Sequence, residues 1–316
     1  MGKGRVTGAS WSKADPGIVM TSDEGGTLAV WDLVTNTTRS LVYGRNTVYC
    51  LACHPDDPDM VAVGCKLGLV LLVSVAGTGR VIHRMRGHDE DVYSLAWSPS
   101  MQVTIGEDAY MEWLVASSSR DKSVRVWSAK EGRTVHSVRL PQVDRRGRQD
   151  SGHSWVSVAW PVQGVILSSG TSGELLSWDL AKPGKRGGSE FTILHREHFK
   201  NLFSISCSQD MVYTVGQDRT LVATSLSTSR LVFSLPCFAG FVYCMASNPI
   251  EPSTIAIGAG DGQIRVWRMG GREMFSMTCI HAKMNQSKVM CLAWHPHRAG
   301  LLALEQMRGS LAGWRP

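Results

Sequence analysis

The sequence has no apolar run long enough to cross a membrane as a helix. Such a helix needs about 20 apolar residues, whereas the longest apolar stretch is LVLLVSVA at 69–76, which is typical of one buried strand. The first residues, MGKGRVTG, contain no apolar signal core, and Val6 stands where the myristoylation pattern needs serine or threonine. We therefore expect no membrane partner and no secretory route.

The sequence also lacks paired cysteines and a strong charge of one sign. Its eight cysteines are scattered singly through apolar segments, as buried thiols in a reducing compartment are. The net charge is +6, a mild basic excess that permits nucleic-acid binding without requiring it. Composition thus predicts a cytoplasmic protein that is also nuclear, with ample apolar material for a core.

One pattern recurs about seven times along the chain. Its clearest copy is GHDEDVYSLAWSP followed by WLVASSSRDKSVRVWS, where alternation of period two predicts strands and Asp and Gly mark the turns. The strand-ending positions lie 42 to 54 residues apart, at Trp31, Val73, Trp127, Trp178, Thr224, Trp267 and Trp314. The first strands of the repeats are expected at Val6–Trp11, Val48–His54, Val92–Pro99, Trp155–Pro161, Leu202–Cys207, Val242–Pro249 and Val289–Pro296.

This period is typical of WD repeats, in which each repeat forms one four-stranded blade. A single blade cannot bury both faces of its sheet, so neighbouring blades must stack around an axis. The predicted fold is all-β: a WD-repeat β-propeller region over 1–316, with seven repeats and about seven four-stranded blades. Polar, basic loop insertions are expected at 140–154 and 180–192. The first contains Arg145, Arg146 and Arg148, which either contact RNA or belong to solvated connectors.

Two motifs resemble chemical sites. Cys50-Leu-Ala-Cys53-His54 matches the C-x-x-C-H haem pattern, but residues three apart on a strand point to opposite faces, so neither haem nor zinc is expected. His88, Ser94 and Asp121 could be taken for a hydrolytic triad. With Trp127 they also occupy the places of the structural tetrad of a WD repeat, a buried hydrogen-bond network. We expect the tetrad, no enzyme activity, no metal and no cofactor.

Several longer strings resemble one family more specifically. VIHRMRGHDEDVYSLAWSP, SSGTSGELLSWDL, TVYCLACHPDDPDMVAVG, and AGFVYCMAS followed by IAIGAGDGQIRVW are similar to the snRNA-recognising Gemin family of the survival-of-motor-neuron (SMN) complex. The resemblance implies two packed seven-bladed propellers that bind the uridine-rich Sm site and the methylguanosine cap of small nuclear RNA. It also implies SMN-complex proteins as partners, spliceosomal snRNP assembly for mRNA splicing, and contacts with ribosomes that influence translation.

Relative to that family, the chain is expected to be incomplete at both ends, spanning the end of one propeller and the start of a second. The resemblance assigns RNA contacts to Trp155, Phe241, Tyr243 and Lys200. Single-stranded RNA is held by aromatic faces that stack on bases and by cations that follow phosphates. The alternative for the three aromatic residues is packing in the rim or core.

Two functions therefore stay open. The first is an RNA-binding propeller that recognises small nuclear RNA for SMN-complex assembly. The second is a WD-repeat scaffold that binds only proteins, and the fold alone cannot choose between them. Aromatic and basic residues that converge on one face would favour the first.

Overall fold

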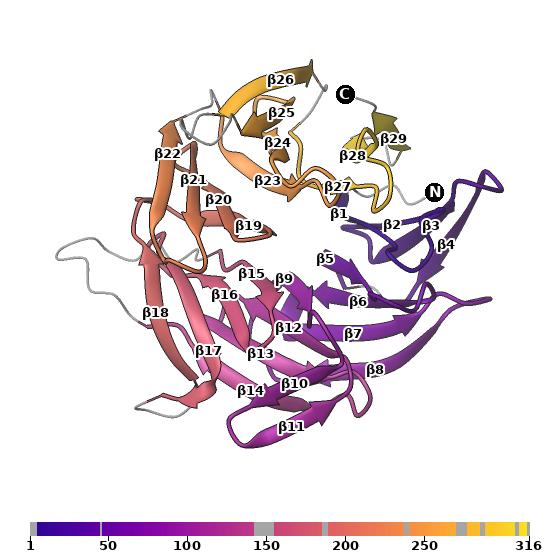
Figure 1. Ribbon diagram of the computed structural model, residues 1–316. Coiled ribbons are helices and arrows are strands. Elements are labelled where there is room, and N and C mark those ends of the chain that lie inside the picture. The colour runs from indigo at the N-terminus through magenta and orange to yellow at the C-terminus, as the bar shows by residue number, and fades with distance from the viewer. Residues whose placement is uncertain are drawn as a thin grey trace.

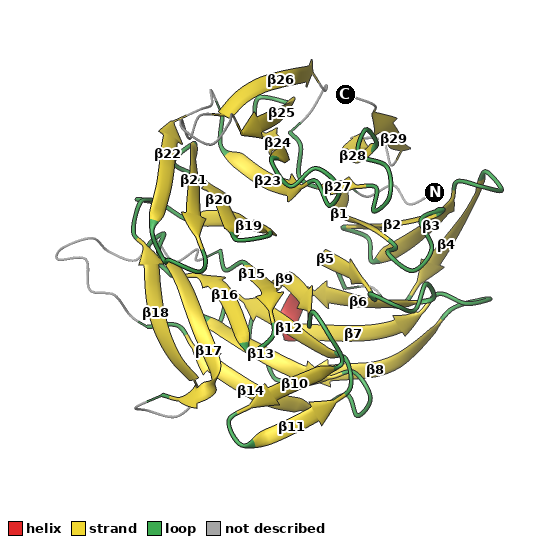
Figure 2. Cartoon of the chain, in the orientation of Figure 1, coloured by secondary structure: helices red, strands yellow, loops and turns green. Residues whose placement is uncertain are grey.

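The computed structural model describes residues 5–44, 46–141, 155–184, 189–236, 240–269, 277–284, 288–306 and 310–314. These residues form a ring of antiparallel sheets around a central channel (Figure 1). The only helical element among them is a 3-10 turn, η1 (Lys66–Gly68), and strands make up almost all the regular structure (Figure 2). None of the described helical structure is long and apolar enough to span a membrane.

Six of the sheets have four strands, and the first strand of each lies nearest the channel (Figure 1). The first three blades consist of β1 (Val6–Trp11), β2 (Ile18–Asp23), β3 (Thr27–Asp32) and β4 (Thr37–Val42); β5 (Val48–Cys53), β6 (Met60–Cys65), β7 (Leu69–Ser74) and β8 (Arg80–Arg86); and β9 (Val92–Trp97), β12 (Leu114–Ser119), β13 (Ser123–Ser128) and β14 (Thr134–Arg139). The next three consist of β15 (Val158–Val162), β16 (Val165–Ser169), β17 (Leu175–Pro183) and β18 (Ser189–His195); β19 (Leu202–Ser208), β20 (Met211–Gly216), β21 (Thr220–Ser225) and β22 (Leu231–Pro236); and β23 (Val242–Ser247), β24 (Thr254–Ala259), β25 (Gln263–Met269) and β26 (Met277–Met284).

The number of blades differs from the sequence prediction. The seventh repeat forms a three-stranded sheet of β27 (Leu292–Trp294), β28 (Leu302–Gln306) and β29 (Ser310–Trp314). The described chain thus has six four-stranded blades, and the expectation of about seven is wrong by one. The predicted strand-ending positions do lie in the third strand of each sheet, including Thr224 in β21. Repeat spacing reveals where a third strand ends, but it does not show whether a fourth strand follows.

The sheets pack on one another through their apolar faces. Strands such as β6 and β12 are buried along almost their whole length, because both of their faces are covered by neighbouring blades. One cluster joins blades three and four through Val126, Val158 and Trp178. Another joins Trp11 and Val19 of the first blade to Ala303 of the seventh sheet. The ring is therefore closed by contacts between the first and last sheets of the chain.

An additional hairpin, β10 (Gln102–Ile105) and β11 (Asp108–Met111), extends from the connection between β9 and β12. Its buried Val103 and Ile105 join the apolar cluster of blades three and four, and the Gly106 amide donates to the Leu180 carbonyl. The hairpin therefore lies against the outer part of the fourth blade rather than in solvent. The repeat pattern did not predict it.

The two predicted insertions have different outcomes. Residues 142–154, including Arg145, Arg146 and Arg148, lie outside the described residues. The segment 180–192 is mostly strand rather than loop, since β17 continues to Pro183 and β18 begins at Ser189. Leu180 is buried in the core of blades three and four. The glycine- and lysine-rich composition of this segment favours a loop. A few buried apolar residues are nevertheless enough to hold it in a strand.

Candidate functional site

The channel is lined by residues that β-bulges turn away from the sheets. In five blades the pairing between the first and second strands skips one residue: Thr7, Tyr49, Tyr93, Phe203 and Tyr243. A bulge leaves one residue unpaired and redirects its side chain relative to the regular pleat. Each of these five side chains lines the central cavity. In the fourth blade, whose first strand starts only at Val158, Trp155 lines the cavity instead.

Five of these side chains form an aromatic belt, defined as Tyr49, Tyr93, Trp155, Phe203 and Tyr243. Neighbouring rings are in contact from blade two to blade six. Tyr49 meets Tyr93 edge to face at 5.4 Å, Tyr93 stacks on Trp155 at 4.2 Å and 5°, and Trp155 meets Phe203 at 5.6 Å. Phe203 stacks on Tyr243 at 5.5 Å. These spacings are those of favourable aromatic pairs, so the belt is a continuous surface.

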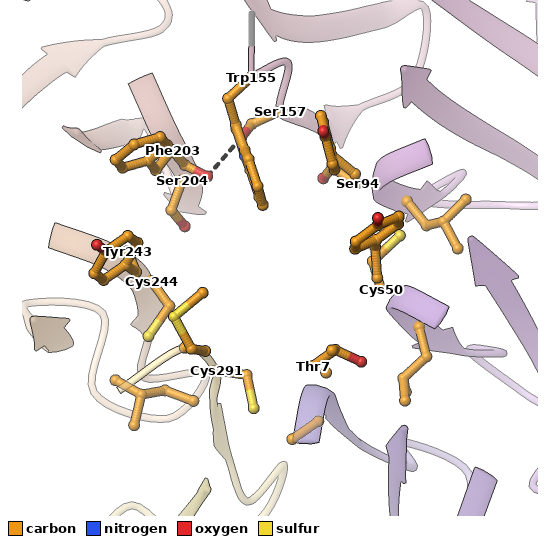
Figure 3. Close-up of a pocket in the computed structure, with 18 of the residues that line it drawn as sticks. Thr7, Cys50, Ser94, Trp155, Ser157, Phe203, Ser204, Tyr243, Cys244 and Cys291 are labelled. Atoms are coloured by element: carbon orange, nitrogen blue, oxygen red, sulfur yellow. Dashed lines mark hydrogen bonds between the residues drawn. The ribbon is translucent and has the colours of Figure 1, made fainter. Parts of the chain in front are cut away.

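The belt surrounds a cavity of about 260 Å³ that opens along the axis of the ring. Figure 3 shows labelled side chains from different blades around an open centre, with Trp155 and Tyr243 on the same side of it as Phe203. Burial raises the pKa of Tyr49 to about 12, with the Asp91 carboxylate adding to the shift. The phenol is therefore neutral at physiological pH, and the belt offers apolar faces with hydroxyl groups rather than charge.

A second set of channel residues ties neighbouring blades together from the second blade to the seventh sheet. Cys50 Sγ is 3.6 Å from the Val92 carbonyl, Ser94 Oγ donates to the Val158 carbonyl, and Ser157 Oγ donates to the Phe203 carbonyl at 2.6 Å (Figure 3). Ser204 Oγ and Cys244 Sγ make the corresponding contacts with the Met245 and Val289 carbonyls. Burial raises the pKa of the Cys50 thiol, so it stays protonated and can act as a donor. The channel wall is thus held by side chains that reach from blade to blade.

Of the residues assigned to RNA from the sequence, Trp155, Phe241, Tyr243 and Lys200 are described by the structure, whereas Arg145, Arg146 and Arg148 are not. Trp155 and Tyr243 are members of the belt. Phe241 precedes β23, is 40% exposed, and contacts Tyr243 edge to face at 6.5 Å. Lys200 is exposed just before β19. Trp155 already stacks on Tyr93, so it offers a base less free surface than Phe241 does.

Sequence reasoning missed Tyr49, Tyr93, Phe203 and Lys288. The first three follow the first apolar residue of their repeats, in Val48-Tyr49, Val92-Tyr93 and Leu202-Phe203, which is the place Tyr243 has in its own repeat. Alignment of the repeats on this position would have found the whole set. Lys288 lies before the seventh sheet, with Nζ 5.8 Å from the centre of the Tyr243 ring. Cation–π contacts of this kind hold a charge beside an aromatic face.

The predicted tetrad contains one wrong residue. His88 Nδ1 bonds to Asp121 at 2.8 Å, but His88 Nε2 bonds to Ser117 at 2.8 Å, and the Trp127 indole donates to Ser117 at 2.7 Å. Ser117 lies on β12, the strand beside Trp127, where its side chain points into the blade. Ser94 lies on β9, and its hydroxyl points toward the fourth blade. The fourth member of the tetrad is therefore Ser117 and not Ser94.

The fifth blade contains a variant of this network. His198 Nδ1 is 3.0 Å from Asp218, and His198 Nε2 is 2.9 Å from Thr214, but Thr224 occupies the place of the tryptophan. His195, at the end of β18 in the preceding blade, supplies the missing donor through Nε2 at 3.2 Å from Thr214. The Glu197 amide donates to His195 Nδ1, which fits a neutral imidazole. Burial and the neighbouring His198 lower the pKa of His195 to about 3.

Both hydrogen-bond networks connect neighbouring strands in buried parts of the molecule. His88 and Ser117 are almost inaccessible to solvent, as are His198 and Thr214. A serine that shares its hydroxyl with an indole and an imidazole inside a blade has no room for a substrate. In the described part of the chain, no group of three or more His, Cys, Asp or Glu side chains is arranged to hold a metal ion. The arrangement favours binding at the channel over chemistry in the blades.

Comparisons with known proteins agree with this architecture. The family "WD domain, G-beta repeat" matches residues 79–128. Over 93% of its length the chain is 29% identical to Gem-associated protein 5 of Mus musculus and of Homo sapiens, spanning 22% of each of those proteins. It is 23% identical to Component of gems protein 5 of Dictyostelium discoideum, over 84% of this chain and 26% of that protein.

A solved structure shares the fold. A chain in "Crystal Structure of Mitotic Checkpoint Complex" superposes with a TM-score of 0.77, covering 98% of this chain and 86% of that one, at 16% identity. That likeness concerns the fold alone. With the matched repeat, the ring of sheets and the similarity over 93% of the chain, it leads to one conclusion. The chain is a β-propeller with one matched WD repeat, and its sequence resembles that of Gem-associated protein 5.

Proposed function

We propose that this chain binds single-stranded RNA at the mouth of its channel, and that the RNA is a small nuclear RNA recognised for spliceosomal snRNP assembly with SMN-complex proteins. The uridine-rich Sm site and the methylguanosine cap are the proposed ligand features, in the cytoplasm and the nucleus, with translation regulation as a further role. The similarity to Gem-associated protein 5 supports the assembly. The aromatic belt is the evidence for single-stranded RNA as the ligand.

The aromatic belt is the observation that carries the proposal. Successive bases of a single strand stack on aromatic side chains, and each stacked base contributes about 1–3 kcal/mol. Five rings in contact, continued by Phe241 at the mouth, form such a surface. A hydrophobic core would bury these rings completely, whereas all five are only partly buried and line an open cavity.

Side chains of both charges are exposed around the mouth. Asp89 and Glu90 are exposed before the third blade. Lys200 and Lys288 are exposed before the fifth blade and the seventh sheet, on the side that carries Phe241. Because phosphates are attracted by ammonium groups, Lys200 and Lys288 are proposed to hold the RNA backbone beside Phe241.

Fluorescence anisotropy with a labelled uridine-rich RNA tests the proposal. The intact chain should bind the single strand and bind a duplex of the same length more weakly. Tyr243→Ala should weaken binding by about 5- to 150-fold, the equivalent of one stacked base. Phe191→Ala removes an aromatic ring that is 37% exposed but lies on outer strand β18, and it should leave affinity unchanged. Absence of binding to the single strand, or equal effects of both variants, would refute the proposal.

The second candidate is a scaffold that binds only proteins. Two exposed methionines favour this scaffold role: Met101, just before β10, and Met111, at the end of β11. Exposed flexible apolar side chains are common at protein interfaces. Under this alternative, Met111→Ala would weaken capture of a protein partner, and the belt variants would have no effect on RNA.

A further inference from the structure

The turns between the second and third strands lie at the channel mouth. In several blades the backbone amide directly after the second strand donates to the carbonyl directly before the first strand. Examples are the Arg120 amide to the Asp91 carbonyl and the Gln217 amide to the Asn201 carbonyl. Gly260 N bonds in the same way to the carbonyl of Phe241. These turns therefore border the surface on which the belt opens.

In the six four-stranded blades, one position in these turns has left-handed backbone. In four blades it is glycine, namely Gly26, Gly68, Gly173 and Gly262, with φ between +71° and +94°. At three of them a Cβ would also collide with backbone: it would lie 2.8 Å from the Asn46 carbonyl oxygen beside Gly26, 2.0 Å from that of His88 beside Gly68, and 2.5 Å from that of His198 beside Gly173. Glycine is thus required in those blades by both conformation and space.

The remaining two blades have a cation at this position. Lys122 has φ +63° and Arg219 has φ +66°. Long side chains rarely adopt this conformation, and glycine, asparagine or aspartate adopt it with less strain. On the opposite face of the ring, the left-handed residues other than glycine are Asn36, Gln209 and Ser229. Among the described residues, the mouth face alone combines this strain with long cationic side chains, and Leu67 is the other non-glycine residue there with left-handed backbone.

The two cations belong to blades three and five, on either side of the blade that supplies Trp155. Those blades also contribute Tyr93 and Phe203, the neighbours of Trp155 in the belt. We propose that Lys122 and Arg219 are phosphate-contacting residues, held in strained turns so that they flank an RNA strand stacked at Trp155. This inference rests on the proposed function and extends it to residues that hold the RNA backbone.

Glycine substitution tests the inference, because it relieves the strain and removes the charge together. We expect Lys122→Gly and Arg219→Gly each to stay folded, with a single cooperative melting transition. We also expect each to reduce the slope of log affinity against log salt by about 0.7, since one single-strand phosphate contact is lost. The double variant should reduce it by about 1.4. Lys122→Arg and Arg219→Lys keep the charge and should preserve the slope.

Matched controls lie on the far face. Asn36→Gly and Ser229→Gly make the same backbone change, at φ +55° in both cases, and should leave RNA affinity and slope unchanged. If RNA binds and Tyr243→Ala weakens it while Lys122→Gly and Arg219→Gly keep the original slope, the inference fails and the proposed function stands. If no single-stranded RNA binds the intact chain, both fail. Loss of the cooperative melting transition in the glycine variants would show that the side chains serve the fold instead.

Discussion

At the scale of single residues, Trp155 and Phe241 illustrate two ways in which an aromatic side chain can serve the channel. Trp155 is packed between Tyr93 and Phe203, and its indole nitrogen is buried with no acceptor in the described structure. Phe241 touches Tyr243 only at its edge and is 40% exposed. The first residue shapes the belt and the second extends it outward.

Alanine substitutions should separate these roles. Trp155→Ala should lower the free energy of unfolding by about 1–3 kcal/mol, because it removes packing on two rings, and it should also weaken RNA binding. Phe241→Ala should weaken RNA binding by about 5- to 150-fold with almost no change in stability. Thermal melting and anisotropy on the same samples measure both quantities. Loss of stability without loss of affinity in both variants would make the two residues purely structural.

The corrected tetrad gives a second prediction at this scale. With His88 Nδ1 donating to Asp121, Nε2 accepts from the Ser117 hydroxyl, which in turn accepts from Trp127. Ser117→Ala should lower the free energy of unfolding by about 2–4 kcal/mol, since a buried acceptor and a buried donor both lose their partner. Ser94→Ala should lower it by only about 0.5–1.5 kcal/mol, the typical contribution of one hydrogen bond. Denaturant titration would contradict this assignment if Ser94→Ala had the larger effect.

At the scale of the blade, the fifth unit has Thr224 at the place of the tryptophan, and His195 supplies the donor to Thr214 instead. This arrangement makes its network sensitive to acid. His195 is neutral in the folded protein because its pKa is about 3, whereas a histidine in the unfolded chain titrates near 6.5. Between these two values the unfolded chain binds a proton that the folded chain does not. The neutral His195 therefore makes its full contribution to the free energy of unfolding above about pH 6.5. That contribution falls as the pH drops toward 3.

Melting curves from pH 7 to pH 4 measure this effect. Stability should decrease on acidification by up to about 1.4 kcal/mol per pH unit from this group alone. His195→Gln keeps a side-chain amide donor for Thr214 but has no proton to gain, so its stability should depend less on pH. Burial also lowers the pKa of His54 and His136. Their effect on the pH dependence of stability is the same in the unaltered chain and in the His195→Gln variant. Identical pH dependence of the two proteins would exclude His195 as a source.

Much of the blade architecture follows from sequence alone, and its exceptions have physical causes. Alternation and turn residues locate the third strands, even where Thr224 replaces tryptophan. The serine of the tetrad was misassigned because Ser94 and Ser117 both lie on strands of one blade. Only the register, in which Ser117 pairs with Arg125 two residues from Trp127, shows which one faces the indole. Register depends on bulges that a repeat pattern does not display.

The site was predictable in part for the same reason. Trp155, Phe241 and Tyr243 were identified through a family resemblance, whereas Tyr49, Tyr93 and Phe203 follow from equivalence between repeats. The residues directly before them, Val48, Val92 and Leu202, are buried in the core, so composition cannot distinguish the belt from packing. In five blades the bulge in the first strand shows which residue faces the channel, and it becomes visible only when the strand pairing is known.

At the scale of the whole molecule, the contacts between first strands link most of the ring. Ser94, Ser157 and Ser204 each donate to a carbonyl of the next blade. The triple alanine variant should lose about 0.5–1.5 kcal/mol for each bond, and it should still unfold in a single transition because the apolar clusters continue to join the blades. Calorimetry tests both statements. Three independent transitions, or no change in stability, would show that these bonds do not couple the blades.

The bulges also have an evolutionary consequence. Because each redirected residue leaves the ladder of its sheet, its side chain can be exchanged without disturbing the pairing of its neighbours. The first blade already has Thr7 at this place, and the seventh sheet contributes Met290 to the same cavity. The ring therefore behaves as a set of separately adjustable positions around one axis. A lineage could alter which ligand it selects one blade at a time while the scaffold stays the same.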